Sequence, residues 1–344
     1  MHSFNTTTKR LGFACKFAEI NKKGEIASVE GLNTGGTTMA WAKRQTSRQV
    51  VEDKIIDVAK TNIMNTHNLV KKVATLPEPL RMLRITSDML SFYTHEDYKD
   101  FWKSPYVQNL LEHWMAPIGE TARANNVRLS FHPDQFVVLA SETESIVNKS
   151  IEEFEYHTDM ARWMGYGKTF QDMKINVHIS GRQGPEGIRK AYQRLSPEAR
   201  NCITIENEEN AWGLDDCLTL SDLLPIVLDI HHHWCREGEY LDITDERVQR
   251  VIMSWRGLRP TLHYSVSRED ILVNHCPDTL PCRDSLIASG KNKQKLRAHS
   301  DYYWNNAVNK WAMTFNDKFD IMCESKAKNL AVAKLYEEYV NGNV

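Results

Sequence analysis

Long apolar runs are missing from this chain of 344 residues. No stretch approaches the roughly 20 apolar residues that a membrane-spanning helix needs. The start also lacks the apolar segment of a secretory signal peptide, because Lys9 and Arg10 lead directly into a short strand-like run. Neither sign of charge dominates, since 43 basic and 45 acidic residues leave a net charge of −2. We therefore expect a protein of the cytoplasm, or of the nucleus in a eukaryote, that is not secreted and has no membrane partner.

Cysteine is sparse and scattered, with seven residues in the whole chain. Cys15, Cys202 and Cys323 lie inside apolar runs, which is typical of buried reduced thiols rather than disulfides. Cys276 and Cys282 bracket a short loop, but their spacing is not that of a zinc knuckle. This pattern excludes a small disulfide-stapled fold, and the length is ample for one large core.

Glycine- and proline-rich linkers are also missing, so we expect residues 1–344 to form a single domain. Short β-type runs alternate with longer segments whose apolar residues recur at a spacing near 3.6, the period of an amphipathic helix. Eight such strand–helix units predict a closed parallel barrel, the (β/α)8 or TIM-barrel fold. The expected strands are 11–17, 82–87, 128–133, 174–180, 202–207, 225–230, 261–265 and 319–325. The expected helices are 53–73, 107–125, 143–164, 185–195, 245–255, 299–315 and 326–339, the last with Ser325 as its N-cap, and a weaker one at 215–224.

Two long non-repetitive segments interrupt this rhythm, at 19–48 after strand one and at 268–297 after strand seven. Both follow strands, and the carboxyl ends of the strands form the face on which TIM-barrel enzymes keep their active sites. Each segment has a basic cluster, which suits phosphate contacts but would also suit a solvated loop. The clusters are Lys43, Arg44 and Arg48 in the first segment and Arg283, Lys291, Lys293, Lys295 and Arg297 in the second.

Side chains that can bind metal recur at or just after the carboxyl ends of the expected strands. A barrel mouth cannot hold several bare carboxylates without compensating charge, so we expect divalent metals there. Mixed imidazole and carboxylate ligands favour zinc, manganese or iron, and paired metals suit displacement at a phosphate. The residues are His95, His132, His178, Glu206, Asp229, His231, His232, His233, His263, His299 and Glu324.

The Asp229–His232 spacing restricts the backbone at strand six. Residues three apart on a strand face opposite sides, so both reach one cluster only if the chain leaves the strand after Ile230. His231 and His233 could support the ligands from behind or be ordinary surface histidines, and we expect neither to bind metal.

These residues stand in segments that resemble the UV damage endonuclease family, in the same order and along nearly all of the expected barrel. The first is Leu11-Gly12-Phe13-Ala14-Cys15 in the opening strand. The others are Arg84-Ile85-Thr86-Ser87-Asp88 with His95, His132-Pro133-Asp134-Gln135-Phe136, Val177-His178, Ile205-Glu206-Asn207, Asp229-Ile230-His231-His232, Pro260 with His263 and Ser265, His299-Ser300-Asp301-Tyr302, and Asp320-Ile321-Met322-Cys323-Glu324-Ser325-Lys326.

The resemblance implies a barrel related to endonuclease IV with a cluster of two to three divalent metals, manganese being the first choice and zinc the alternative. His132, His178 and Glu206 would hold one metal, and Glu206 would bridge to a second held by Asp229, His263 and Glu324. A third metal would bind His232 and His299. His95 matches a family histidine that serves as a ligand or as a catalytic group at the phosphate, so His95 and Glu206 are the catalytic candidates.

The family hydrolyses the phosphodiester bond on the 5′ side of a lesion and leaves a 3′-hydroxyl. It accepts UV photoproducts and often abasic sites. The resemblance therefore implies damaged double-stranded DNA as the partner, a role in DNA repair, and no nucleotide cofactor.

Three positions depart from the family pattern. Gln135 and Phe136 stand where the family has a Gln-Tyr lesion probe, and Phe136 could still fill a vacated base stack. Thr261 stands where the family usually has a lysine that can be carboxylated, so we expect the third metal to be held more weakly than the others. Phe17 replaces a polar residue near the end of strand one. The expected DNA-binding residues are Gln135, Phe136, Phe13, Lys291, Lys293 and Lys295.

Two other classes of protein fit the barrel. One is a metal-dependent sugar isomerase or epimerase, although such enzymes usually rely on a carboxylate-rich metal pair and a small closed pocket. The other is a non-catalytic relative that binds lesions without cutting. The histidine-rich ligand set and the basic 268–297 segment favour the endonuclease over both.

Overall fold

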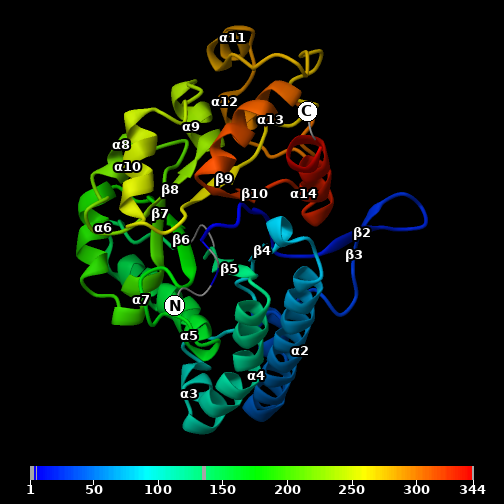
Figure 1. The fold of residues 1–344 in the computed structure, drawn as a ribbon. Coiled ribbons are helices and arrows are strands. Elements are labelled where there is room, and N and C mark those ends of the chain that lie inside the picture. Colours follow the sequence, from blue (N-terminus) through cyan, green and yellow to red (C-terminus); the bar gives the residue numbers. More distant parts are fainter. Residues whose placement is uncertain (1–3, 5, 134–136, 343–344) are drawn as a thin grey trace.

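Eight parallel strands close into a barrel in the computed structural model, which describes residue 4 and residues 6–133 and 137–342 (Figure 1). The order around the barrel is β1-β10-β9-β8-β7-β6-β5-β4, so neighbours in the sequence are neighbours in the barrel. This confirms the predicted TIM-barrel fold. The strands are β1 Leu11–Ala14, β4 Met82–Arg84, β5 Arg128–Phe131, β6 Lys174–His178, β7 Ile203–Glu206, β8 Ile226–Asp229, β9 Thr261–Tyr264 and β10 Asp320–Cys323.

All eight predicted strands are confirmed, and each is shorter than its apolar run. The runs continue past the strands because residues such as Ile85 and Ile179 are buried although they follow the last residue of their strand. Nearly every strand residue is buried, as expected when helices cover the outer face of a parallel barrel.

Helices surround the barrel and follow the predicted segments closely where the apolar period is long. The long helices α2 and α4 lie side by side (Figure 1). The helices are α1 Met39–Ala42, α2 Arg48–Ala74, α3 Lys99–Trp102, α4 Pro105–Ala124, α5 Glu144–Trp163, α6 Gly184–Tyr192, α7 Pro197–Cys202, α8 Leu214–Leu218, α9 Ile230–Glu237, α10 Glu246–Ser254, α11 Arg283–Ala288, α12 Lys293–Leu296, α13 Asn306–Met313 and α14 Asn329–Tyr336, with 3-10 turns at Glu78–Leu80 and Thr314–Asp317 and a π-helical turn at Glu337–Asn341.

Three predicted helix starts are wrong. The helix predicted from 53 begins at Arg48, because the Ser47 side chain caps it by accepting a hydrogen bond from the Val50 N–H. The helix predicted from 299 begins only at Asn306, because the Asn305 side chain accepts a hydrogen bond from the Val308 N–H and His299 instead forms a β-bridge with Ser267. The helix predicted from 326 begins at Asn329, preceded by Lys328 with φ of 54°, so Ser325 is not its N-cap.

The two long segments are partly ordered into small elements. The first forms the antiparallel hairpin β2 Ala18–Ile20 and β3 Ile26–Ser28, which projects from the side of the barrel, followed by α1 (Figure 1). The second contains α11 and α12 and lies beyond the barrel near α13 (Figure 1).

A buried charge cluster closes the amino-terminal end of the barrel. The Asp320 carboxylate is fully buried and pairs with Arg128 and Arg259 at 2.7 Å each, and with Arg10 at 3.4 Å. Arg259 also donates to the backbone carbonyl of Phe319 at 2.7 Å. One carboxylate thus pairs with three guanidinium groups, and its loss would leave them facing one another in a buried place. Asp320 is therefore central to stability.

All seven cysteines are free thiols. Cys202 and Cys323 are buried, as predicted from their apolar surroundings, whereas Cys15 is half-buried and Cys276 and Cys282 are exposed. In the described part of the chain, no helix is long and apolar enough to cross a membrane.

Candidate metal centre

Metal-capable side chains from neighbouring strands converge at the carboxyl end of the barrel. Within each of three groups, the potential ligand atoms all lie within 4.8 Å of one another. The groups are His132, Glu206 and His263; His178, Glu206 and His232; and Asp229, His263 and Glu324.

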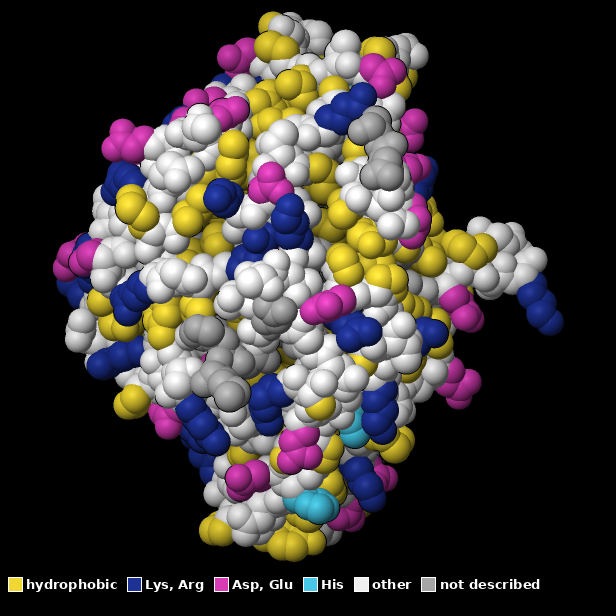
Figure 2. Space-filling model, viewed as in Figure 1, with side chains coloured by type: hydrophobic (Ala, Val, Ile, Leu, Met, Phe, Trp, Pro, Cys, Tyr) yellow, Lys and Arg dark blue, Asp and Glu magenta, His cyan; other side chains and the backbone are white. Residues whose placement is uncertain are grey.

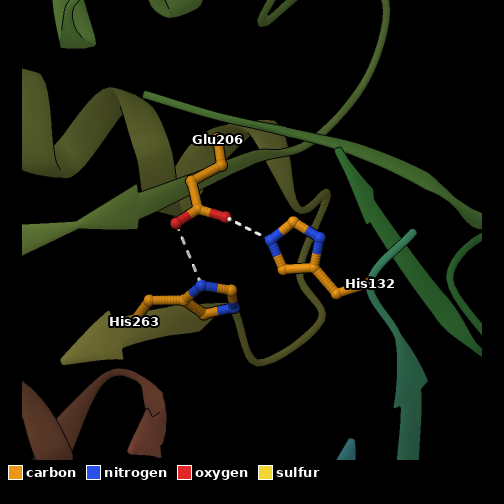
Figure 3. Close-up of side chains that lie close together, drawn as sticks. All are labelled: His132, Glu206 and His263. Carbon is orange, nitrogen blue, oxygen red and sulfur yellow. Dashed lines mark hydrogen bonds and ion pairs between the residues drawn. The ribbon is translucent and has the colours of Figure 1, made fainter. Parts of the chain in front are cut away.

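Glu206, the last residue of β7, is the centre of this arrangement and is fully buried. Its two carboxylate oxygens face different histidines: Oε2 lies 3.2 Å from His132 Nε2, and Oε1 lies 3.0 Å from His263 Nδ1 (Figure 3). Asn176 also donates a hydrogen bond to Oε2. Burial alone would raise the pKa of Glu206, but the neighbouring imidazoles, His263 foremost, lower it well below its usual value. An ionised carboxylate shared by two ligand groups is the arrangement that a bridging metal ligand requires.

Three of the candidate metal-binding histidines have one ring nitrogen within hydrogen-bond distance of a backbone carbonyl. The Nδ1 atoms of His132, His232 and His299 lie 3.1, 3.1 and 2.8 Å from the carbonyl oxygens of Pro133, Asn207 and Glu324, respectively. An Nδ1–H donor to a carbonyl leaves Nε2 with a free lone pair, which is the form of histidine that binds metals. The backbone therefore presets each ring for a metal on its Nε2 side.

Asp229 both ends β8 and caps the helix that follows. Its Oδ1 accepts hydrogen bonds from the backbone N–H groups of His231 and His232 at 2.7 Å each. The chain therefore leaves the strand after Asp229, one residue earlier than predicted, and α9 begins at Ile230. This turn brings Asp229 and His232 to one cluster, with Oδ2 of Asp229 3.7 Å from His232 Nδ1.

The other Asp229 oxygen, Oδ2, is buried and has no hydrogen-bond partner among the described residues. Burial raises the pKa of Asp229 well above its usual value. Burial alone would lower the pKa of His232, but Asp229, Glu206 and further carboxylates raise it to about 9. The two shifts indicate that the buried carboxylates around His232 lack a compensating positive charge. Together with the free Nε2 atoms, they show that the residues present fit a divalent metal.

Glu324 follows β10 and pairs with Arg84 from β4. Burial would raise its pKa, but Arg84 and then His263 lower it well below its usual value. Arg84 lies in the Arg84–Asp88 motif, but the sequence predicts no separate role for its side chain. Its guanidinium brings a fixed positive charge to the edge of the ligand cluster.

Lys174 is a second residue that sequence reasoning missed. Its buried Nζ lies 2.8 Å from His263 Nε2, and burial lowers its pKa to about 7. A lysine on β6 thus contacts His263 on β9. Thr261, on the same strand as His263, offers only a buried hydroxyl without a hydrogen-bond partner in the described structure. Strand parity could have found it, because Lys174, Asn176 and His178 alternate along one strand and share its inward face.

His299 and His95 lie at the margins of the cluster. Among the described residues, the three groups of close ligand atoms do not include either of them. His299 stands edge-on to His231 with ring centroids 6.0 Å apart. His95 is more exposed and lines an adjoining cleft of about 910 Å³, together with Lys16, Thr86 and Lys149.

His231 and His233 are buried, so they are not surface histidines. His233 Nε2 lies 3.1 Å from Glu239, and the His231 ring stacks on Trp234 with centroids 5.8 Å apart. Neither belongs to a close ligand group among the described residues, and both pack behind the site.

A smaller cavity of about 250 Å³ adjoins His178 and is lined by Glu208, Glu209 and Arg297. Glu209 Oε2 lies 3.8 Å from His232 Nε2, and Glu209 Oε1 accepts a hydrogen bond from Arg297 at 2.5 Å. In the sequence, Arg297 is one member of a basic cluster and Glu209 has no distinguishing signal, because their contact depends on how two distant loops meet.

The expected DNA-binding residues differ in where they lie. Gln135 and Phe136 fall outside the described residues. Phe13 is 1% exposed and packs edge-on against Phe17, so it is a core residue and its predicted contact with DNA is wrong for this structure. Lys293 and Lys295 are exposed on α12, and Lys291 just before it is half-buried.

The fold and the site together define the class: a TIM-barrel enzyme with a candidate divalent metal centre at the carboxyl ends of its strands. A family model described as UV-endonuclease UvdE matches residues 9–343. The chain therefore belongs to the UV-endonuclease UvdE family and is an enzyme of the UV damage endonuclease type. Membership in this family excludes the alternative interpretation of the barrel as a sugar isomerase or epimerase.

Curated relatives and solved structures agree with this assignment. The chain is 26% identical over 314 residues to a UV DNA damage endonuclease of Bacillus velezensis, covering 88% of each chain. It is 25% identical over 304 residues to one of Bacillus thuringiensis subsp. konkukian, covering 85% of each. The crystal structure of SacUVDE superposes with a TM-score of 0.70 at 22% identity, covering 95% of this chain and 96% of that one. Endonuclease IV from Thermus thermophilus has the same fold, with a TM-score of 0.51 at 12% identity and the same coverage.

Proposed function

We propose that this chain, acting as one domain, is a metal-dependent repair endonuclease. It hydrolyses the phosphodiester bond on the 5′ side of UV photoproducts in double-stranded DNA, with abasic sites as further substrates, and leaves a 3′-hydroxyl. The observation that carries the proposal is Glu206, a buried ionised carboxylate common to two of the three ligand groups. A bridging carboxylate of this kind serves paired metals, which suit displacement at a phosphate.

The metals, two or three ions of manganese or alternatively zinc, would activate a water, neutralise the phosphate and stabilise the leaving oxygen. His132, His178, Glu206, Asp229, His263 and Glu324 would hold two of them, and His232 with His299 would hold the third. Arg84, paired with Glu324, would contact the scissile phosphate. His95, in the adjoining cleft, would act on the phosphate side.

A nicking assay tests this proposal directly. Ultraviolet-irradiated, abasic and undamaged duplexes are incubated with the protein in the presence of manganese, zinc or a chelator. We expect damaged duplexes to be nicked with manganese and to stay intact with the chelator. Nicking that persists in excess chelator would contradict a metal-dependent reaction, and binding without nicking would instead indicate the non-catalytic relative.

Duplex binding is proposed to use the basic segment at 268–297. On the face drawn in Figure 2, Lys and Arg side chains form several small groups interspersed with Asp and Glu. Changing Lys291, Lys293 and Lys295 to Ala is expected to weaken binding to damaged and undamaged duplexes alike. The slope of log affinity against log salt should flatten by up to about 0.9 per lost contact.

The control for this triple variant is Lys318→Ala, an exposed lysine just before β10, at the far end of the barrel. Its salt dependence should match that of the unchanged protein. An unaltered slope in the triple variant would show that the segment is solvated in the complex.

Lesion recognition is proposed to use Gln135 and Phe136. Extruding a photodimer costs less than extruding normal bases, because damaged bases stack and pair less well. Phe136 would then stack in the vacated gap while Gln135 bonds the orphaned base. Phe136→Ala should cost about 1–3 kcal/mol of binding to dimer-containing duplex, the scale of one base–aromatic stack. An equal loss on undamaged duplex, measured by fluorescence anisotropy, would contradict a probing role.

A further inference from the structure

His232 has one ring nitrogen engaged and one available. Its Nδ1 lies 3.1 Å from the backbone carbonyl of Asn207, which leaves Nε2 as the atom that a metal would bind in place of a proton. Among the ion pairs of the described residues, the carboxylate facing this Nε2 is that of Glu209, with Oε2 3.8 Å away. Two atoms that bind one ion at about 2.0–2.2 Å lie about 3–4 Å apart, so this separation suits a shared metal.

We propose that Glu209 is an additional, anionic ligand of the metal at His232. The inference rests on the proposed metal centre and deepens it. A third metal held by His232 and His299 alone would have only neutral ligands, and a divalent ion binds more tightly when a carboxylate completes its site.

The surroundings of Glu209 suit this role. Its side chain is only 13% exposed, and it lines the cavity of about 250 Å³ that His178 also lines. The carboxylate is divided between two partners: Oε1 accepts from Arg297 at 2.5 Å, while Oε2 faces the imidazole. Arg297 therefore orients the carboxylate and leaves one oxygen for the metal. Hydrogen-bond partners of metal ligands commonly orient them in this way.

Glu208 lines the same cavity and is the natural alternative ligand. Burial, together with the adjacent Glu209, raises the pKa of Glu208 to about 7. Burial would also raise the pKa of Glu209, but His232 and then backbone and Arg297 contacts lower it. Among the described residues, no ion pair joins the Glu208 carboxylate to a ligand histidine, whereas Glu209 Oε2 lies 3.8 Å from His232 Nε2. Glu208→Gln is therefore a matched control.

The experiment titrates metal-free protein with manganese alone and follows free manganese by electron paramagnetic resonance. The unchanged protein is expected to bind two ions tightly and a third more weakly. Glu209→Gln should leave the two tight ions in place and lower the affinity for the third ion by at least about 10-fold. Loss of a residue that only supports a metal ligand already has an effect of this size. Glu208→Gln should change the dissociation constant of the third ion by less than about two-fold, because no ion pair of the described residues joins Glu208 to a ligand histidine.

A second variant keeps a ligand but changes its chemistry. Imidazole favours zinc, whereas carboxylate favours manganese, so Glu209→His should retain a third ion when zinc is the probe and lose it when manganese is. A merely structural glutamate would not change metal preference in this way, and elemental analysis after dialysis reads the result. Thermal melting confirms that each variant is folded.

The outcomes separate this inference from the proposed function. Unchanged protein that binds no manganese would overturn the metal centre and the inference with it. Third-ion binding by Glu209→Gln equal to that of the unchanged protein would overturn the ligand assignment alone. Loss of the third ion in Glu208→Gln instead would likewise show that the wrong carboxylate has been chosen.

Discussion

Glu206→Gln is expected to abolish nicking of damaged duplex while binding to the same duplex persists. Glu206 lies in two candidate ligand groups, so loss of its charge would loosen two of the proposed metals at once. Such metals would supply several kcal/mol of transition-state stabilisation, and a loss of about 4 kcal/mol corresponds to about 10³-fold in rate. Duplex binding depends mainly on phosphate contacts, which the substitution leaves in place.

The control for this prediction is Glu142→Gln, an exposed residue 3.5 Å from Arg182 and outside the three ligand groups. It should nick at the rate of the unchanged protein. Single-turnover rates and gel-shift affinities on one dimer-containing duplex measure both effects. Nicking by Glu206→Gln at the normal rate would remove the bridging role on which the proposed metal centre depends.

The largest expected effect on stability is at the other end of the barrel. Asp320→Asn removes the negative charge with which Arg10, Arg128 and Arg259 all pair in a buried cluster. Removing one partner of a buried ion pair costs about 3–5 kcal/mol, because the remaining charge stays desolvated. The free energy of unfolding, measured by urea denaturation, should fall by that amount.

Asp317→Asn is the matched control, since Asp317 is three residues away and pairs with Lys9 in an exposed position. Exposed ion pairs contribute little, so its unfolding midpoint should stay close to that of the unchanged protein. Equal effects of the two substitutions would show that burial of the cluster does not govern its contribution.

The barrel could be predicted from the sequence because its signals are local and repeated. Eight apolar runs alternating with 3.6-period segments allow few other folds, and the observed strands fall inside all eight runs. The candidate ligands could also be predicted, because carboxyl ends of parallel strands meet at one face, so that Glu206, Asp229 and His263 had to be close.

Several of the predictions that were wrong concern features that depend on contacts between distant segments of the chain. The start of α13 is set by the Asn305 cap and by the pairing of Ser267 with His299, and neither is visible in helical periodicity. The predicted DNA contact of Phe13 came from its place in a motif, but its burial is decided by the packing of a whole barrel strand.

Arg84 and Lys174 were missed for the same reason. Arg84 meets Glu324 across a separation of 240 residues, and Lys174 meets His263 across 89. Strand parity places Lys174 inside the barrel, but only the three-dimensional arrangement shows which ligand its amine reaches.

The measurement that tests the central claim most directly uses a duplex with one cyclobutane dimer at a known position and a label on the damaged strand. With manganese present, we predict one cut immediately 5′ to the dimer, and a DNA polymerase should extend the labelled product because its end is a 3′-hydroxyl. The undamaged duplex of the same sequence should stay intact. A cut on the 3′ side, a product that cannot be extended, or equal cutting of the undamaged duplex would contradict a 5′-acting UV damage endonuclease.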